Sequence, residues 1–195
     1  MEKVEKNINE LVYLIAKEYA NGEVEKKALF DLYEMYRVPF YFVALSLLQN
    51  NKKAELAAAE AFKRIEASAY RFEETLNAQY WFFDVLYTLC ANAAETTSIQ
   101  SGDLWRGKLL PAECYIKLYS ELTWSEISSL TGAKNSEAKK ALAKEENTAQ
   151  VKETAGQSCP DYWENVISGK NTDFEKRCIN YTIFMHTCQE VAKRK

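Results

Sequence analysis

Proline, glycine and histidine are scarce in this chain of 195 residues, which has three prolines, six glycines and one histidine. Few chain-breaking residues favour long helices over many short strands, so the sequence predicts an all-α fold. One histidine leaves little material for acid–base chemistry. The sequence also lacks a phosphate-binding glycine loop, an HExxH motif and a nucleophile elbow. We therefore expect neither catalysis nor a cofactor.

Long apolar runs are missing as well. No stretch of about 18 apolar residues occurs, so we expect no segment that spans a membrane. The N-terminal MEKVEKNINE is charged and lacks the apolar stretch of a signal peptide, so the expected location is the cytoplasm. Five cysteines, an odd number at irregular spacing, favour reduced thiols over a disulfide framework.

An excess of positive charge is the third absence. The chain carries 25 Lys and Arg against 28 Asp and Glu, a formal net charge of −3. Proteins that bind DNA mainly through its phosphates usually have a basic domain. The charge therefore predicts weak autonomous binding to duplex DNA, although a partner protein could supply most of the affinity. Hydrophobic residues make up 47% of the chain, which is enough for a real core.

Apolar residues recur at helical spacing along most of the chain. They predict helices at about residues 3–20, 29–47, 53–67 and 77–92, a new helix from Pro111, and helices at about 160–167 and 173–192. Pro39 should kink or divide the second of these helices. Residues 94–108 and Glu145 to Gly156 are polar and predicted to separate helical units.

These boundaries divide the chain into five parts. We expect an N-terminal helix extension at 1–24, a helical domain at 25–93, a linker at 94–108, a small helical domain at 109–147 and a helical C-terminal extension at 148–195.

The segment LTWSEISSLTGAK contains signals for two short helices and a turn. Thr123 and Glu126 form a capping-box pattern, and Gly132 suits the left-handed position that ends a helix. A second helix is expected from Asn135, with Ala138 and Leu142 facing inward. This is the pattern of a DNA-binding helix-turn-helix, although an ordinary pair of packed helices has it too.

Four stretches in order carry a resemblance to a known family. They are LFDLYEMYRVPFYFVALSLL, AELAAAEAFKRI, YRFEETLNAQYWFFDVLYTLCAN and LLPAECYIKLYSELTWSEISSLTGAKNSEAKKAL. Their order and spacing over about residues 25–147 resemble the extracytoplasmic-function group of bacterial RNA polymerase sigma factors. The resemblance implies two helical domains on a flexible tether. It also implies a protein that binds core RNA polymerase, recognises promoter DNA and helps to open it, with a regulatory anti-sigma-type protein as a further possible partner.

The resemblance assigns polymerase binding to the second stretch, at Glu55, Leu56, Ala59 and Glu60. Leu56 and Ala59 stand where the family has Asp and Gln, and we expect both on the outward face of their helix. An apolar outward face predicts either a different contact with the polymerase or another protein partner. The alternative is that Leu56 packs under the N-terminal helix.

The resemblance assigns the melted promoter strand to Arg71, Tyr80, Phe83 and Tyr87. Aromatic rings stack on unpaired bases, whereas Asp84 beside them would repel the DNA backbone. The alternative is that these rings pack against the N-terminal helix or the C-terminal segment, because aromatic residues at helical spacing more often belong to the core.

Duplex DNA contact is assigned to Lys134, Asn135, Ser136, Lys139 and Lys140. The lysines and Ser136 suit phosphates, and Asn135 suits a base edge. The alternative for the lysines is a solvated helix face.

The C-terminal extension lies outside the resemblance. His186 and Cys188 are two residues apart and do not share a helix face, so we expect no metal site there or with Cys178 and Cys159. Apolar residues that include Tyr162, Trp163, Val166 and Ile167 predict helices that dock on the other domains. Docking there could cover a polymerase- or DNA-binding face. The alternative to a sigma factor is a diverged sigma-like interaction module without promoter recognition.

Overall fold

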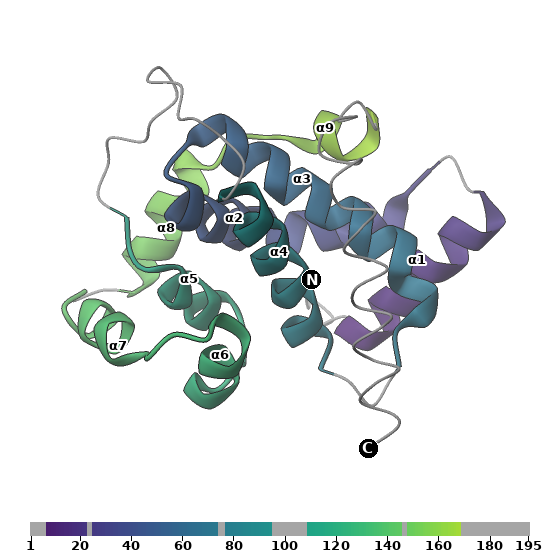
Figure 1. Cartoon of the computed structure of the whole chain (residues 1–195). Coiled ribbons are helices and arrows are strands. Elements are labelled where there is room, and N and C mark those ends of the chain that lie inside the picture. Colours follow the sequence, from purple (N-terminus) through teal and green to yellow (C-terminus); the bar gives the residue numbers. More distant parts are fainter. Residues whose placement is uncertain (1–6, 23–24, 74–76, 95–108, 146–147, 169–195) are drawn as a thin grey trace.

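The computed structural model describes residues 7–22, 25–73, 77–94, 109–145 and 148–168. These residues form helices and no β-strand, which confirms the predicted all-α fold for this part of the chain. Figure 1 shows the elements: α1 Ile8–Asn21, α2 Lys27–Leu48, α3 Asn51–Ser68, the short 3-10 helix η1 Ala69–Arg71, α4 Ala78–Ala94, α5 Ala112–Tyr119, α6 Trp124–Thr131, α7 Ser136–Ala143, α8 Thr148–Ser158 and α9 Trp163–Ser168.

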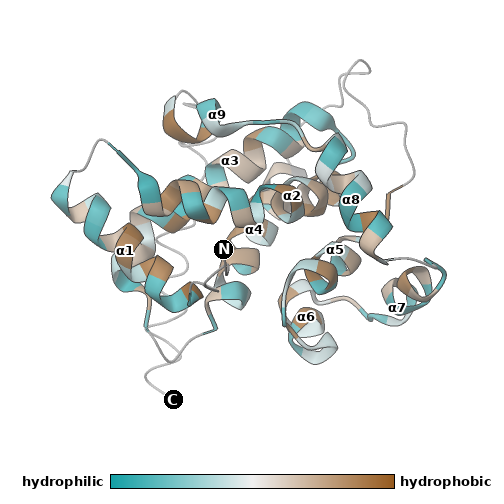
Figure 2. Cartoon of the chain, turned by 180° about the vertical axis from the view of Figure 1, so that it is seen from behind, coloured by the Kyte–Doolittle hydropathy of each residue, from teal (hydrophilic) through white to brown (hydrophobic). Residues whose placement is uncertain are grey.

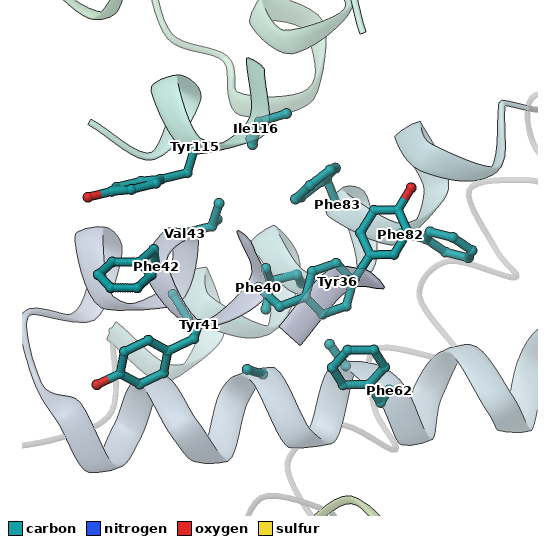
Figure 3. Close-up of a cluster of buried hydrophobic side chains, with 14 of the residues drawn as sticks. Tyr36, Phe40, Tyr41, Phe42, Val43, Phe62, Phe82, Phe83, Tyr115 and Ile116 are labelled. Atoms are coloured by element: carbon teal, nitrogen blue, oxygen red, sulfur yellow. The ribbon is translucent and has the colours of Figure 1, made fainter. Parts of the chain in front are cut away.

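Helix α2 lies at the centre and contacts α1, α3, α4, α5 and α8. Aromatic rings fill the space around it, as Figure 3 shows. The Phe40 ring lies 4.8 Å from that of Phe62 on α3 and 5.6 Å from that of Phe83 on α4, measured between centroids. All three side chains are fully buried. Aromatic side chains remove more apolar surface from water than most other side chains, so this cluster is a main source of stability.

Pro39 does not divide α2, which runs unbroken from Lys27 to Leu48. A proline inside a helix removes one backbone hydrogen bond and costs about 3 kcal/mol or more. Burial on several sides offsets that cost here, because Pro39 and the six residues after it are all buried.

Helix α1 begins and ends as its capping residues require. The Asn7 side chain accepts a hydrogen bond from the Asn9 amide, and Gly22 ends the helix with a φ of 63° in the left-handed region. Leu11, Val12 and Ile15 are buried, and α1 contacts α2, α3, η1 and α4. The N-terminal helix therefore belongs to the core of the bundle.

Helices α5 and α6 are packed against the bundle. The Phe42 and Tyr115 rings stack with centroids 5.2 Å apart, and the Ser46 hydroxyl donates to the Leu110 carbonyl at 2.6 Å. The predicted linker lies outside the described residues except for Ala94, which ends α4. The helices on either side of it share one hydrophobic core.

The C-terminal extension differs from its prediction in one respect. Residues 148–158 were expected to lie largely in a polar separating stretch, but they form α8, most of which is hydrophilic in Figure 2. Ala155 is buried and Val151 is half-buried, which gives this polar helix one packed side. The helix predicted at 160–167 is present as α9, and the one predicted at 173–192 lies outside the described residues.

Candidate functional site

Helices α6 and α7 are the two short helices that the sequence predicts on either side of Gly132. The Thr123 hydroxyl oxygen accepts from the Glu126 amide at 3.3 Å, and the Glu126 carboxylate accepts from the Thr123 amide at 2.7 Å. These two bonds confirm the capping box. Hydrogen bonds from the backbone and then the hydroxyl of Thr123 lower the pKa of Glu126. Gly132 ends α6 with a φ of 68°, as its position predicts.

Helix α7 presents lysines to solvent. Lys134, Ser136, Lys139 and Lys140 are exposed, as expected for a surface that contacts a phosphate backbone. Lys139 also lies over the Trp124 ring, with its Nζ 5.6 Å from the ring centroid. Among the described elements, α5 is the one that makes substantial contact with α7. The outer face of α7 is therefore open.

Asn135 does not share that exposure. It is 9% exposed, and its side-chain amide donates to the Trp124 carbonyl. The expectation that Asn135 faces a DNA groove is wrong, because this side chain ties the turn to the start of α6. Its Oδ1 is buried and has no hydrogen-bond partner among the described residues.

The aromatic residues of α4 are buried or half-buried, because α4 packs against α1, α2, α3 and α6. Phe83 is fully buried and contacts Tyr36 and Phe40 of α2, so its assignment to the promoter strand is wrong and the alternative of packing inside the protein holds for this ring. Tyr80 and Tyr87 are half-buried. Their pKa values are raised by burial and then by carboxylates, which include Glu126 of α6 for Tyr80 and Glu113 of α5 for Tyr87.

Gln79 of α4 is hydrogen-bonded both to α2 and to the segment that leads into α6. Its side-chain amide donates to the Tyr36 hydroxyl at 3.1 Å, and its side-chain oxygen accepts from the Glu121 amide at 2.9 Å. The predicted strand-binding face of α4 is thus partly covered in this arrangement, because α6 contacts α4, and Figure 1 shows α4 beside α5 and α6. Asp84 is partly buried, which raises the pKa of its carboxyl group.

Arg71 lies on η1, whereas the aromatic residues assigned to the same role lie on α4. It is exposed, and its guanidinium group lies over the Tyr70 ring, 4.9 Å from the centroid. Its Nε also donates to the Tyr70 hydroxyl. Of the four residues assigned to the promoter strand, Arg71 is the most exposed.

The α3 residues assigned to polymerase binding are mostly covered. Ala59 is 2% exposed and Glu60 is 4% exposed, whereas Glu55 and Leu56 are half-buried. The expectation of an outward face at Leu56 and Ala59 is therefore wrong for Ala59. Helix α3 packs on more than one side, because α1, α2, α4 and α9 all contact it.

Glu60 is buried together with a partner. One carboxylate oxygen accepts from Arg64 Nε at 3.0 Å, and the other has no hydrogen-bond partner among the described residues. The i, i+4 spacing of Glu60 and Arg64 is a sequence signal for this ion pair. The pairing could therefore be predicted from the sequence, whereas the burial of Glu60 beside a half-buried Arg64 could not.

Residues 159–168, which we call the strap, lie against the surface formed by α2 and α3. Figures 1 and 2 both show α9 alongside α3. Tyr162 is 1% exposed, and its hydroxyl donates to the Arg37 carbonyl at 2.7 Å. Val166 is buried as well, which confirms the prediction that this segment docks on the bundle. Ile167 differs, because it is 44% exposed.

A hydrogen-bond chain seats the strap. The Tyr33 hydroxyl donates to Asp161 Oδ1 at 2.7 Å and accepts from the Tyr162 amide at 2.8 Å. Asn165 donates its side-chain amide to the Glu55 carboxylate. Asp161 also accepts from the Trp163 amide at 3.0 Å, and its bonds to Tyr33 and then Trp163 lower its pKa. Sequence patterns gave no sign of the pairing between Tyr33 and Asp161.

Two structural requirements concern the described residues, those of a metal-ion cluster and of a membrane-spanning helix. Within them, no three His, Cys, Asp or Glu side chains are grouped to hold a metal ion, and Cys178, His186 and Cys188 lie outside them. The same ranges contain no helix with the length and apolar character needed to cross a membrane. Cys90, Cys114 and Cys159 are free and buried, and burial raises the pKa of each thiol.

Comparison with known proteins found no match: no family model, no curated protein and no solved structure matches the chain.

Proposed function

We propose that this chain is a sigma-factor-like transcription initiation protein, which binds core RNA polymerase and directs it to promoter DNA in the cytoplasm. Support comes from the order of the four sequence stretches together with the helix-turn-helix of α6 and α7. The observation that carries the proposal is the open face of α7 and of the turn before it. Lys134, Lys139 and Lys140 are exposed there, just after the capped helix α6.

The chemistry of that face fits phosphate contact better than base recognition. Lys134 and Lys140 are exposed cations, and Ser136 at the first position of α7 offers a hydroxyl group. Asn135, the side chain best suited to a base edge, is held inside the turn. Acidic groups at Glu137 and Glu145 lower the local potential. We therefore propose weak intrinsic DNA affinity, which polymerase binding supplements.

The second candidate function is a protein-interaction module without promoter recognition. The observation that favours it is the burial of Ala59, Glu60 and Phe83, three of the residues that the sigma reading assigns to polymerase and promoter. A diverged module would keep the helical framework, and exposed rings such as Tyr13 and Tyr70 would offer contact surface.

Binding to a mixed-sequence DNA duplex of about 30 base pairs tests the DNA-binding part. Each phosphate contact contributes about −0.9 to the slope of log K against log salt concentration. The double variant Lys134→Ala/Lys140→Ala should therefore reduce that slope by about 1.8. Lys17→Ala, which removes an exposed lysine from α1, is the matched control. An unchanged slope in the double variant would contradict DNA contact through α7.

Co-elution of the full chain with bacterial core RNA polymerase on size exclusion tests the polymerase part. A charge-matched helical protein serves as the control for non-specific association. A stable complex supports the sigma reading and makes promoter-directed transcription the next assay. Absence of a complex, for the wild type and for chains with a released strap as described below, would favour the interaction module.

A further inference from the structure

The strap is held by two deeply buried side chains, Tyr162 and Val166, and by a few polar contacts. The Tyr162 ring lies 5.2 Å from the ring of Tyr33 and 6.3 Å from that of Phe62. Its hydroxyl and its amide both have partners, in the Arg37 carbonyl and the Tyr33 hydroxyl. A buried tyrosine with both polar groups satisfied is typical of an anchor residue at a protein interface.

The strap covers one particular face of α3. Asn165 contacts Glu55, and the Tyr162 ring approaches that of Phe62, so both ends of this face touch the strap. Positions 55, 59 and 62 follow the i, i+4, i+7 spacing of a single helix face. Ala59 lies between these two positions on the same face and is 2% exposed.

The rest of the strap is less firmly enclosed. Helix α9 has six residues, and Asp161, Glu164 and Ile167 are exposed. Trp163 is half-buried and meets the exposed ring of Phe30 edge-on, with centroids 5.0 Å apart. A helix of this length is not stable by itself, so its order depends on docking. The strap is accordingly a segment whose release would leave the α2–α4 core in place.

We propose that the strap is an intramolecular inhibitor of polymerase binding: it occupies the Glu55–Ala59 face of α3 and must leave before core RNA polymerase binds there. This inference rests on the proposed sigma-like function. The closed strap lowers the apparent affinity by the fraction of molecules in which it is open. If the strap is open in about a tenth of molecules or fewer, its release strengthens apparent binding about tenfold or more.

The test uses full-length chains with strap substitutions and two measurements on each. Tyr162→Ala removes the anchor. Asp161→Ala/Asn165→Ala removes polar contacts and keeps the buried ring, so it remains informative if the first variant folds poorly. Glu164→Gln alters an exposed residue of α9 and is the matched control.

The first measurement is hydrogen exchange of amides in residues 159–168 of the isolated chain, which reports strap release without any partner. The second is the dissociation constant for core RNA polymerase. We expect both strap variants to exchange faster and bind about tenfold more tightly, whereas Glu164→Gln should match the wild type in both measurements.

Two results separate failure of this inference from failure of the proposed function. Faster exchange with an unchanged dissociation constant would overturn inhibition by the strap and leave polymerase binding intact. Faster exchange with no binding by the wild type or any variant would overturn polymerase binding, and the inference with it. Wild-type exchange rates in both strap variants would overturn the assignment of Tyr162 and its neighbours as the contacts that hold the strap.

Discussion

Removal of the Tyr33 hydroxyl group tests the physical account of strap docking most directly. Tyr33 is 1% exposed, and burial raises its pKa well above the ordinary value, so the hydroxyl stays protonated and donates to Asp161. It also accepts from the Tyr162 amide. Tyr33→Phe keeps the ring in place and removes both hydrogen bonds.

The two lost bonds differ in their cost. The Tyr162 amide is buried and has no other hydrogen-bond partner among the described residues. Loss of its bond to Tyr33 therefore leaves a buried donor unsatisfied, which costs about 1–3 kcal/mol. Asp161 is exposed, so water replaces the tyrosine hydroxyl there at little cost. We expect Tyr33→Phe to lower the free energy of strap opening by about 2 kcal/mol. Since 1.4 kcal/mol is a factor of ten, strap amides should exchange about 30-fold faster.

Hydrogen exchange of residues 159–168 under conditions where opening is fast provides the measurement. Tyr13→Phe is the matched control, because Tyr13 is 66% exposed on α1. Asp161→Ala should accelerate exchange less than Tyr33→Phe, because its partner keeps the bond to the Tyr162 amide. A change of less than about threefold in Tyr33→Phe would refute the assignment of the Tyr162 amide as a buried group that depends on Tyr33.

Three further outcomes follow from the packing and backbone geometry. Phe83→Ala should lower the free energy of unfolding by about 3–5 kcal/mol in urea denaturation, as for a core residue; a change below about 1 kcal/mol would place this ring outside the core. Gly132→Ala should destabilise the chain by about 1 kcal/mol, because φ is positive there, whereas Gly156→Ala in α8 should stabilise it by about 0.5–1 kcal/mol; effects of equal sign would contradict this. The pKa of Asp161 is lower in the folded chain than its ordinary value of 3.8, so its contribution to stability is complete above that value and is lost as the pH falls through the folded pKa. The stability difference between wild type and Asp161→Asn should therefore shrink as the pH falls below 3.8, and a difference that does not change with pH would contradict the role of this carboxylate.

Local sequence signals predicted the elements of this fold well. The capping pair Thr123 and Glu126 and the helix stop at Gly132 depend on neighbouring residues only, so they could be read directly. The all-α character follows similarly from apolar periodicity and from the scarcity of proline and glycine.

Burial of the predicted site residues could not be read in the same way. The sequence interpretation assigned one inward stripe to each helix, whereas α3 and α4 pack on several sides. Alanine at positions 57, 58 and 59 makes α3 nearly uniform around its axis, which left its outward face undefined. The run Trp81-Phe-Phe83 was a usable signal, because a helix that is apolar all round is typically buried.

The strap contacts were beyond local patterns altogether. Tyr33 and Asp161 are 128 positions apart in the sequence, so neither spacing nor propensity connects them. Amphipathic spacing indicated that the C-terminal segment docks, but the receiving surface is defined only by the assembled α2 and α3.

The wide separation between α3 and the strap also sets an order of events during synthesis. Phe62 emerges from the ribosome about 100 residues before Tyr162, which at about 5–20 residues per second is an interval of roughly 5–20 s. During that interval the Glu55–Ala59 face is made but its cover is not. If the strap inhibits binding as proposed, a nascent chain presents this surface to partners before the strap covers it. The timing of translation relative to partner binding would then be part of how such a protein is regulated.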